Sequence, residues 1–124
     1  MPKKILIVED EKHIIELLCT IFDGLANYRT IYARDGQEAL KLARINAPDI
    51  ILLDIYLPEL DGYEVCRFVK SDPTMSHTKV LMISGMAQNS DLLKAQEAGA
   101  DDYITKPFIS TALIEKVEAL LGSN

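Results

Sequence analysis

One stretch near the middle of the chain constrains the fold more than any other. Residues 50–53 are four consecutive aliphatic residues, Ile-Ile-Leu-Leu, which is typical of a strand buried on both faces of a parallel sheet. The run stops at a single carboxylate, Asp54, and turn-forming residues follow at Pro58 and at Asp61-Gly62. Ligands of open α/β sheets bind outside the carboxyl ends of the strands, so Asp54 is a candidate site residue. On its own, an aspartate at such a place is more often a helix cap or a solvated loop acid, and the other strand ends decide between these interpretations.

Strand and helix patterns alternate five times along the 124 residues. The predicted strands are residues 3–8, 30–33, 50–54, 79–83 and 102–104, and the predicted helices are residues 13–22, 35–47, 63–69, 90–98 and 110–121. No internal repeat, low-complexity tract or linker interrupts this order. Because crossovers between parallel strands are right-handed, the alternation predicts a doubly wound five-stranded parallel sheet with helices on both faces. The sequence therefore predicts an α/β fold in a single domain, residues 1–124.

Local signals add detail to some of these elements. The strand at 30–33 is short and polar, which indicates an edge of the sheet. Asp35 followed by Glu38 is typical of a capping box at the start of a helix, and Ser110 is a candidate cap for the last helix. The helix at 90–98 is only weakly amphipathic, so we expect it to be held loosely.

Composition argues against several classes of protein. The chain has 13 Lys and Arg against 19 Asp and Glu, and its net charge of −6 argues against direct binding to nucleic acid or to a membrane surface. No apolar run approaches the length of a membrane span. Cys19 and Cys66 lie among apolar neighbours in predicted helices, so we expect buried free thiols rather than a disulfide or a metal site. A reducing, cytoplasmic location fits these features.

Polar side chains follow four of the five predicted strands. Glu9 and Asp10 follow the first strand, Asp54 ends the third, Ser84 follows the fourth and Lys106 the fifth. In a parallel sheet these ends meet at one edge, so three carboxylates, a hydroxyl and an ammonium would share a small crevice. Mutual repulsion of the three acids opposes folding, so we expect a compensating positive charge.

A divalent cation resolves this conflict. Mg²⁺ prefers carboxylate oxygens, and together with Lys106 it would neutralise the three acids. Lys106 is long enough to reach a phosphoryl oxygen, and Ser84 offers a hydroxyl donor. These groups are suited to moving a phosphoryl group onto Asp54, a reaction in which positioning and charge neutralisation supply most of the catalysis.

Other functions on the same fold explain the residues less well. A flavin or dinucleotide site needs backbone amides and small residues after the first strand, whereas the acids at 9–11 would repel phosphate. A phosphohydrolase of the haloacid dehalogenase type would have a second aspartate where Tyr56 stands. A serine hydrolase needs a base, and His13 and His77 lie in a helix start and a loop, where we expect them to be solvated.

The chain resembles the receiver domains of bacterial two-component response regulators, such as the chemotaxis regulators, along essentially its whole length. The agreement lies in an ordered set of motifs: Ile5-Leu6-Ile7-Val8-Glu9-Asp10, Asp54 with Leu57-Pro58 and Asp61-Gly62, Ser84-Gly85, and Lys106-Pro107-Phe108. Each motif is weak alone, but the set at these spacings is highly specific. The resemblance implies a flavodoxin-like sheet with strand order 2-1-3-4-5 and five helices.

The resemblance also implies roles around a bound Mg²⁺. Asp54 would be the phosphoacceptor and Asp10 a direct ligand of the ion. Glu9 would act on the ion through water, and the backbone carbonyl of Tyr56 would complete the protein ligands.

A second implied set holds the phosphoryl group and responds to it. Ser84 and Lys106 would bind the phosphoryl oxygens, and the bond between Lys106 and Pro107 would be cis. Tyr103 matches the switch aromatic of the family and would act with Ser84. The alternative is an aromatic that only fills a gap at the edge of a strand.

Some positions differ from the commoner residues of the family. Glu9 replaces an Asp, Ser84 replaces a Thr, and Tyr56 is a bulky residue beside the acceptor. None of these differences removes a group that phosphorylation needs. Tyr56 and Met86 border the expected phosphate, so they bear on the lifetime of the phosphoryl group.

The implied function is phosphorelay signalling. Asp54 would receive a phosphoryl group from a sensor histidine kinase or a histidine phosphotransfer protein. This would switch the surface of 90–98, 102–104 and 110–121, which a downstream effector or a linked output domain would recognise. Such a domain is not a conventional enzyme, although it assists its own phosphorylation and dephosphorylation. The alternative is a docking module of the same fold that works without phosphorylation. The sequence leaves open whether the chain is a stand-alone regulator or part of a longer one.

Overall fold

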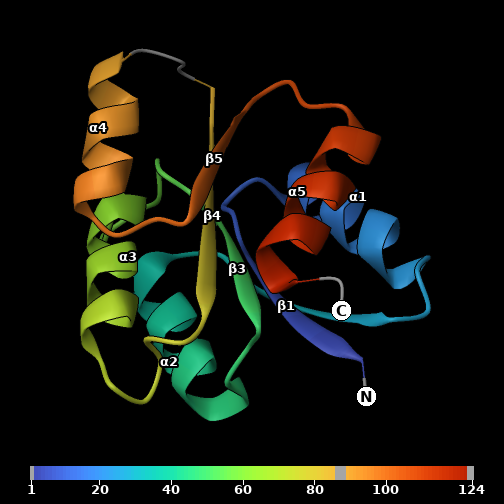
Figure 1. Ribbon diagram of the computed structural model, residues 1–124, viewed down its shortest axis with the longest axis horizontal. Coiled ribbons are helices and arrows are strands. Elements are labelled where there is room, and N and C mark those ends of the chain that lie inside the picture. Colours follow the sequence, from blue (N-terminus) through green and yellow to red (C-terminus); the bar gives the residue numbers. More distant parts are fainter. Residues whose placement is uncertain (1, 86–88, 123–124) are drawn as a thin grey trace.

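A computed structural model describes residues 2–85 and 89–122 of the chain (Figure 1). The strands are β1 (Lys3–Val8), β2 (Tyr28–Ala33), β3 (Ile50–Asp54), β4 (Lys79–Ser84) and β5 (Asp102–Thr105). The helices are α1 (Lys12–Asp23), α2 (Gly36–Asn46), α3 (Gly62–Ser71), α4 (Asn89–Glu97) and α5 (Ser110–Leu121). All ten predicted elements are present in the predicted order.

The five strands form one parallel sheet in the order β2-β1-β3-β4-β5, which confirms the doubly wound α/β fold and the implied strand order. The pairing aligns the carboxyl ends of neighbouring strands. Val8 pairs with Leu53, and Asp54 pairs with Ile83. Ser84 lies opposite Thr105. The residues that follow these strands are therefore brought to one edge of the sheet.

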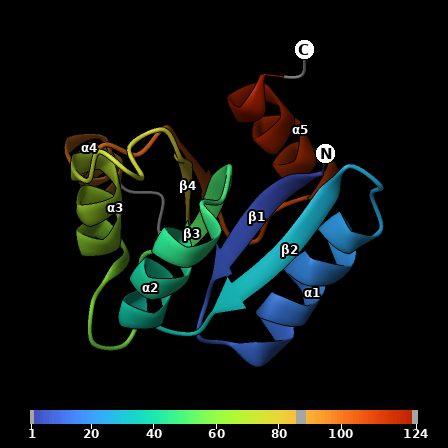
Figure 2. The same ribbon diagram turned by 90° about the horizontal axis from the view of Figure 1, so that it is seen from below.

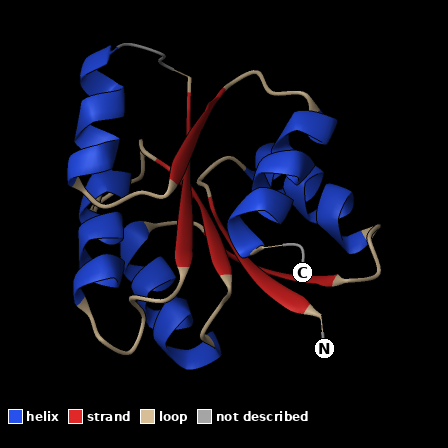
Figure 3. Ribbon diagram, viewed as in Figure 1, coloured by secondary structure: helices blue, strands red, loops and turns tan. Residues whose placement is uncertain are grey.

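The helices cover the sheet in two layers (Figure 3). Alternate strand residues point to opposite faces, so Leu6 contributes to one hydrophobic cluster and Ile7 to the other. The first cluster contains buried side chains from α2, α3 and α4, and the second contains buried side chains from α1 and α5. Because β3 is apolar on both faces, it lies buried between the two layers, as its sequence predicts.

β2 lies at the edge of the sheet beside α1, as predicted (Figure 2). It begins two residues earlier than the sequence suggests, at Tyr28. Tyr28 is buried and packs edge-to-face against Phe22 of α1, with ring centroids 5.4 Å apart. This tertiary contact extends the strand where the local pattern gave no signal.

Helix caps match the sequence in part. The Asp35 side chain caps α2 by accepting from the Glu38 N–H at 2.8 Å, but the Glu38 carboxylate accepts from the N–H of Arg34 at 2.9 Å. The capping box is therefore only half formed. The prediction for Ser110 was wrong, because the cap position of α5 is Ile109 and no side chain caps this helix. The backbone at Ile109 is extended, so the first helical residue is Ser110 itself.

Both cysteines are free, as predicted. Cys66 is fully buried in α3, and its burial raises the pKa of the thiol to about 11. Cys19 is only partly buried, so the expectation of a buried thiol is met fully at Cys66 alone. Among the residues that the structure describes, no helix has the length and apolar character needed to cross a membrane.

Candidate functional site

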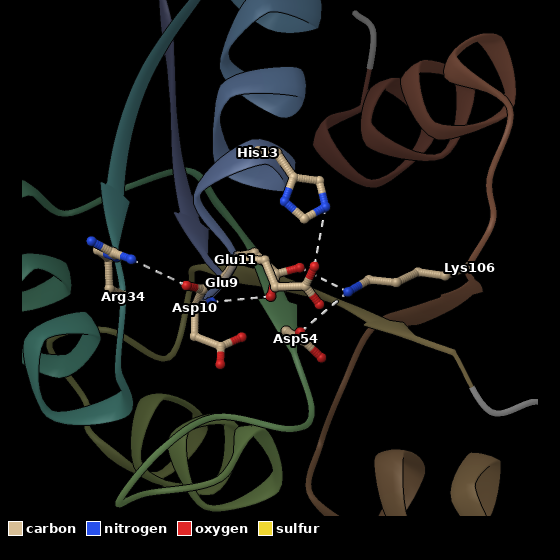
Figure 4. Close-up of polar contacts among 7 residues, drawn as sticks. All are labelled: Glu9, Asp10, Glu11, His13, Arg34, Asp54 and Lys106. Atoms are coloured by element: carbon tan, nitrogen blue, oxygen red, sulfur yellow. Dashed lines mark hydrogen bonds and ion pairs between the residues drawn. The ribbon is translucent and has the colours of Figure 1, made fainter.

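The polar residues at the carboxyl edge of the sheet meet as the sequence predicts (Figure 4). Glu9 follows β1, Asp54 is the last residue of β3, Ser84 is the last residue of β4, and Lys106 follows β5. Figure 4 shows the side chains of Glu9, Asp54 and Lys106 pointing toward one another. The strand order places β1, β3 and β4 side by side, so their ends supply groups to a single site.

Lys106 joins the two buried acids of the site. Its Nζ donates to Oε1 of Glu9 at 2.7 Å and to Oδ2 of Asp54 at 3.2 Å. Only 2% of Glu9 and 7% of Asp54 is exposed to solvent. Buried carboxylates are tolerated when they are paired and hydrogen-bonded, and the ammonium supplies both contacts.

Burial and pairing shift the ionisation of these groups. Burial and the neighbouring Asp54 together raise the pKa of Glu9 to about 8, and Lys106 lowers it by less than Asp54 raises it. For Lys106, burial acts to lower the pKa, but the hydrogen bond to Glu9 and the negative charges of Asp54 and Glu9 outweigh it. The pKa of Lys106 is therefore raised, and its ammonium stays charged at neutral pH. The site as a whole has more negative than positive charge.

Asp10 adds a third carboxylate. Its side chain is exposed, and carboxylate oxygens of Glu9, Asp10 and Asp54 all lie within 4.8 Å of one another. Three carboxylates at this spacing form an all-oxygen donor set, which suits a hard cation such as Mg²⁺ and not a metal that prefers nitrogen or sulfur. The residues present therefore fit the predicted ion.

The loop that carries Asp10 is held by its neighbours. The Asp10 N–H donates to Oε2 of Glu9 at 3.1 Å, and the guanidinium of Arg34 reaches the Asp10 carbonyl at 3.4 Å. Sequence patterns do not indicate the Arg34 contact, because Arg34 lies 24 positions from Asp10 and belongs to no recognisable motif. This contact joins the end of β2 to the acidic loop.

The backbone after β3 fixes the Asp54 carboxylate. The N–H of Tyr56 donates to Oδ1 of Asp54 at 3.1 Å, and the N–H of Gly62 donates to the carbonyl of Ile55 at 2.8 Å. Asp61 caps α3 by accepting from the N–H of Glu64 at 3.0 Å. The pair Asp61-Gly62, predicted as turn chemistry, thus also starts α3 and packs against the acceptor strand.

Gly62 has to be a glycine at this place. A Cβ there would lie 2.7 Å from Cα of Ile55 and would press on the carbonyl oxygen of Asp54. The loop that follows Asp54 folds back over the end of β3 because no side chain separates the two segments.

Ser84 and Lys106 are joined through the backbone. Ser84 is buried at the end of β4, and the N–H of Lys106 donates to its carbonyl at 2.7 Å. The bond between Lys106 and Pro107 is cis, as the resemblance implied. The use of the Ser84 hydroxyl to bind a phosphoryl oxygen stays a prediction.

The other residues singled out by the sequence differ in how far they are buried. Tyr103 is half-buried and packs against the hydrophobic cluster on the α2–α4 side of the sheet, so its switching role stays a prediction. Tyr56 is 55% exposed. Met86 lies outside the described residues. His13 and His77 are exposed as predicted, and His13 pairs with Glu11 at 3.2 Å.

A search against protein-family models finds one that is described as the response regulator receiver domain and matches residues 5–118. Among sequence relatives, the polar-differentiation response regulator DivK of Brucella anthropi is 38% identical over 122 residues, which is 98% of each chain. The alkaline phosphatase synthesis transcriptional regulatory protein PhoP of Bacillus subtilis is 42% identical over 121 residues. This match covers 98% of the present chain and 49% of PhoP.

A solved structure supports the same assignment. The receiver domain of the sensor histidine kinase PA1611 from Pseudomonas aeruginosa aligns with a TM-score of 0.90 and 28% identity. The alignment covers 98% of the present chain and 99% of that domain. That structure is described with a magnesium ion coordinated in the active-site cleft.

Proposed function

Because the chain belongs to the response regulator receiver domain family of two-component signalling, we propose that Asp54 accepts a phosphoryl group in a reaction that requires Mg²⁺. One observation carries this proposal. Asp54 is a nearly buried carboxylate at the carboxyl end of the central strand, and it faces both an ammonium and two further acids. Receiver domains are phosphoacceptor signalling domains, so we do not assign a conventional enzymatic activity to the chain.

The metal site follows from the donor set. Asp10 and Asp54 would bind Mg²⁺ directly, Glu9 would act through water, and the backbone carbonyl of Tyr56 would supply a further oxygen. When bound, the ion would neutralise the acids and the incoming phosphoryl oxygens. The spacing of the three carboxylates supports this set.

In the proposed transfer, an Asp54 carboxylate oxygen attacks the phosphorus of a phosphohistidine on a kinase or a phosphotransfer protein. A new O–P bond forms as the N–P bond breaks, and the imidazole of the donor leaves with the electron pair. Lys106 can turn from the two carboxylates to the transferred oxygens, and Ser84 can donate its hydroxyl to them. Positioning and charge neutralisation are sufficient roles for these residues.

The response would be transmitted through β4 and β5. An acyl phosphate carries roughly two negative charges where Asp54 carried one, and this changes the charge balance of the site. Ser84 and Lys106 lie at the ends of the strands that flank α4, and Tyr103 lies in β5 beside it. Movement of Ser84 and Lys106 onto the phosphoryl group would therefore favour a second arrangement of the α4–β5–α5 surface. A free-energy difference of a few kcal/mol between the two arrangements is sufficient to shift the population.

The partners that we propose are a sensor histidine kinase or a histidine phosphotransfer protein upstream, and an effector protein or a linked output domain downstream. We treat residues 1–124 as one receiver domain that works in the cytoplasm and does not bind nucleic acid or membranes itself. The regulators DivK and PhoP among the relatives support the general assignment and do not identify these partners.

The test is incubation of the purified protein with a small-molecule acyl phosphate and Mg²⁺, followed by intact-mass measurement. We expect a mass gain of one phosphoryl group, which should disappear with EDTA and in Asp54→Asn. The substitution keeps the shape of the side chain and removes the nucleophilic oxygen. Stoichiometric labelling of Asp54→Asn would refute the assignment of the acceptor. A wild-type protein that stays unlabelled with Mg²⁺ would favour the docking module that works without phosphorylation.

A further inference from the structure

Helix α4 is fastened weakly along its length. The side chains that α4 and the residue after it bury among the described residues are small, at Ala95 and Ala98, whereas Leu92 and Leu93 are substantially exposed. Two buried methyl groups contribute little apolar area. The position of α4 therefore depends strongly on polar contacts at its two ends, and these ends differ.

The C-terminal end of α4 is held by a network of short contacts. Beyond this end, Oδ2 of Asp101 lies 2.7 Å from Nζ of Lys70 on α3 and accepts from the N–H of Val80 at 2.8 Å. Nζ of Lys70 also donates to the carbonyl of Thr78 at 2.8 Å. Both charged side chains of this pair are largely shielded from solvent. The network ties the turn between α4 and β5 to α3 and β4.

At the N-terminal end of α4, the contacts that join described residues are longer than those at the C-terminal end. The hydroxyl of Tyr63, at the start of α3, donates to the backbone carbonyl and to Oδ1 of Asp91, each at 3.5 Å. This distance is beyond the usual range for a hydroxyl donor. Burial, together with the negative charge of Asp91, raises the pKa of Tyr63 to about 12, so the hydroxyl keeps its proton and remains a donor.

Asp91 is incompletely satisfied in this position. Its Oδ2 is buried and has no hydrogen-bond partner among the residues that the structure describes. A buried carboxylate oxygen without a partner is unfavourable, and it gains hydration if the first turn of α4 moves outward. The contact with Tyr63 therefore favours the closed position of the first turn of α4, whereas solvation of the Asp91 carboxylate favours the open position.

We propose that Tyr63 and Asp91 form a releasable clasp that holds the first turn of α4 against α3, and that α4 pivots about the Lys70–Asp101 pair when this clasp opens. The trigger, but not the clasp itself, rests on the proposed phosphorylation of Asp54. Tyr63 acts here as a positioning residue, because it touches neither Asp54 nor Lys106 through any hydrogen bond that the structure shows.

There is room for such a movement. An open pocket of about 250 Å³ lies between α4 and β5 and is lined by Leu92, Ala95 and Tyr103, among others. Tyr63 and Tyr103 pack against the same hydrophobic cluster. A change in the position of Tyr103 would therefore alter the packing beside both the clasp and α4. The clasp and α4 could then respond together to the movement of Tyr103.

The clasp can be tested in the unphosphorylated protein by amide hydrogen exchange with Tyr63→Phe, which keeps the ring and removes the donor. We expect exchange at residues 90–95 to become roughly twofold faster, the loss expected for one weak hydrogen bond, while exchange in β4 stays unchanged. Tyr32→Phe is the matched control, since it removes the hydroxyl of an exposed tyrosine on β2. Equal exchange at 90–95 in the wild type and Tyr63→Phe would overturn the proposal.

The attachment at the C-terminal end of α4 is tested with Lys70→Met, which removes the ammonium that pairs with Asp101. This change should lower the melting temperature of the whole domain, whereas Tyr63→Phe should act on the first turn of α4 and leave the melting temperature nearly unchanged. If Lys70→Met speeds exchange only in α4, or if Tyr63→Phe lowers the melting temperature as much as Lys70→Met does, α4 does not pivot about the Lys70–Asp101 pair.

To test whether phosphorylation of Asp54 opens the clasp, the exchange measurement is repeated after incubation with a phosphodonor and Mg²⁺. In the wild type, labelling should speed exchange at residues 90–95, and in Tyr63→Phe this further increase should shrink because the clasp is already open. Labelling without any change at 90–95 would overturn the regulatory role of the clasp. A protein that takes no label would contradict the proposed function, while the comparison of resting proteins, repeated in Asp54→Asn, would still decide whether the clasp exists.

Discussion

Lys106 and Glu9, 97 positions apart in the chain, are joined by a hydrogen bond of 2.7 Å at the carboxyl edge of the sheet. The same ammonium reaches Asp54 at 3.2 Å, so one cation serves two buried acids while Asp10 completes the acidic set. Lys106 is the only cation that is hydrogen-bonded to these three side chains among the described residues. The site therefore keeps an excess of negative charge that a divalent ion can neutralise.

Mg²⁺ should stabilise the folded protein. At a free concentration ten times the dissociation constant, the free energy of unfolding should rise by about 1.4 kcal/mol, which is roughly 5 °C in melting temperature for a domain of this size. The measurement is thermal unfolding with Mg²⁺ against EDTA. Asp10→Asn should show a much smaller increase at the same concentration, because it removes a proposed ligand. An equal increase in both proteins would show that the ion binds elsewhere.

Removal of the ammonium should make the protein more dependent on the ion. In Lys106→Met, Glu9 and Asp54 lose their shared partner, and we expect a loss of about 1–2 kcal/mol in EDTA. The loss is limited because Glu9, whose pKa is already raised to about 8, can take up a proton. Mg²⁺ should then raise the melting temperature of Lys106→Met by more than it raises that of the wild type. A smaller increase would contradict this account of the charges.

Gly62→Ala should damage the site and the fold together. The new methyl group would lie against Cα of Ile55 and the carbonyl of Asp54, so we expect a loss of about 2 kcal/mol or more in the free energy of unfolding. Urea unfolding measures this loss. Gly85→Ala is the control, because a Cβ at Gly85 meets no atom of the described residues within 4 Å and should change stability by much less. Equal effects of the two substitutions would contradict the close packing at Gly62.

The sequence predicts that Glu9, Asp10, Asp54 and Lys106 lie together, because the topology of a parallel sheet determines where its strand ends meet. The carboxyl ends of parallel strands must meet, so residues at the ends of β1, β3, β4 and β5 could be grouped without knowledge of any distance. The sequence did not show that Glu9 is buried while Asp10 is exposed, since this depends on how the loop after β1 leaves the sheet.

Sequence patterns do not predict which side chains of different helices contact one another. Tyr63 and Asp91 are 28 positions apart on different helices, and no local motif joins them. The missed start of β2 at Tyr28 and the wrong cap at Ser110 have a similar cause. A local propensity indicates what a residue favours, but packing against Phe22 and the extended backbone at Ile109 decide where these elements begin.

The two thiols should differ in reactivity. Cys66 is buried and its pKa is raised to about 11, so at pH 8 only about one part in a thousand is thiolate, whereas Cys19 is partly exposed. A disulfide reagent at pH 8 should modify one thiol in the native protein, and the second only after unfolding in urea. The fast reaction should be lost in Cys19→Ser and kept in Cys66→Ala. Two thiols that react at the same rate in the native protein would refute this.

The last prediction concerns the lifetime of the phosphoryl group. Loss of the group from Asp54 requires a water molecule in line with the breaking O–P bond, so the residues around the acceptor control the rate. The backbone N–H of Tyr56 donates to Oδ1 of Asp54 at 3.1 Å, which fixes this residue close to the carboxylate, and Tyr56 as a whole is 55% exposed. A ring at the rim of the site can obstruct the approach of water.

We therefore expect phospho-Asp54 to be lost more slowly in the wild type than in Tyr56→Ala or Tyr56→Asn. The measurement is the decay of the phosphorylated mass after removal of the donor, at constant Mg²⁺. Both substitutions keep the backbone N–H that holds Asp54, so a faster decay would be due to the missing ring. Tyr32→Ala is the matched control, because it removes an exposed tyrosine from β2 and should leave the decay unchanged. Decay that is equal in all proteins, or faster in the wild type, would show that the ring of Tyr56 does not shield the phosphoryl group.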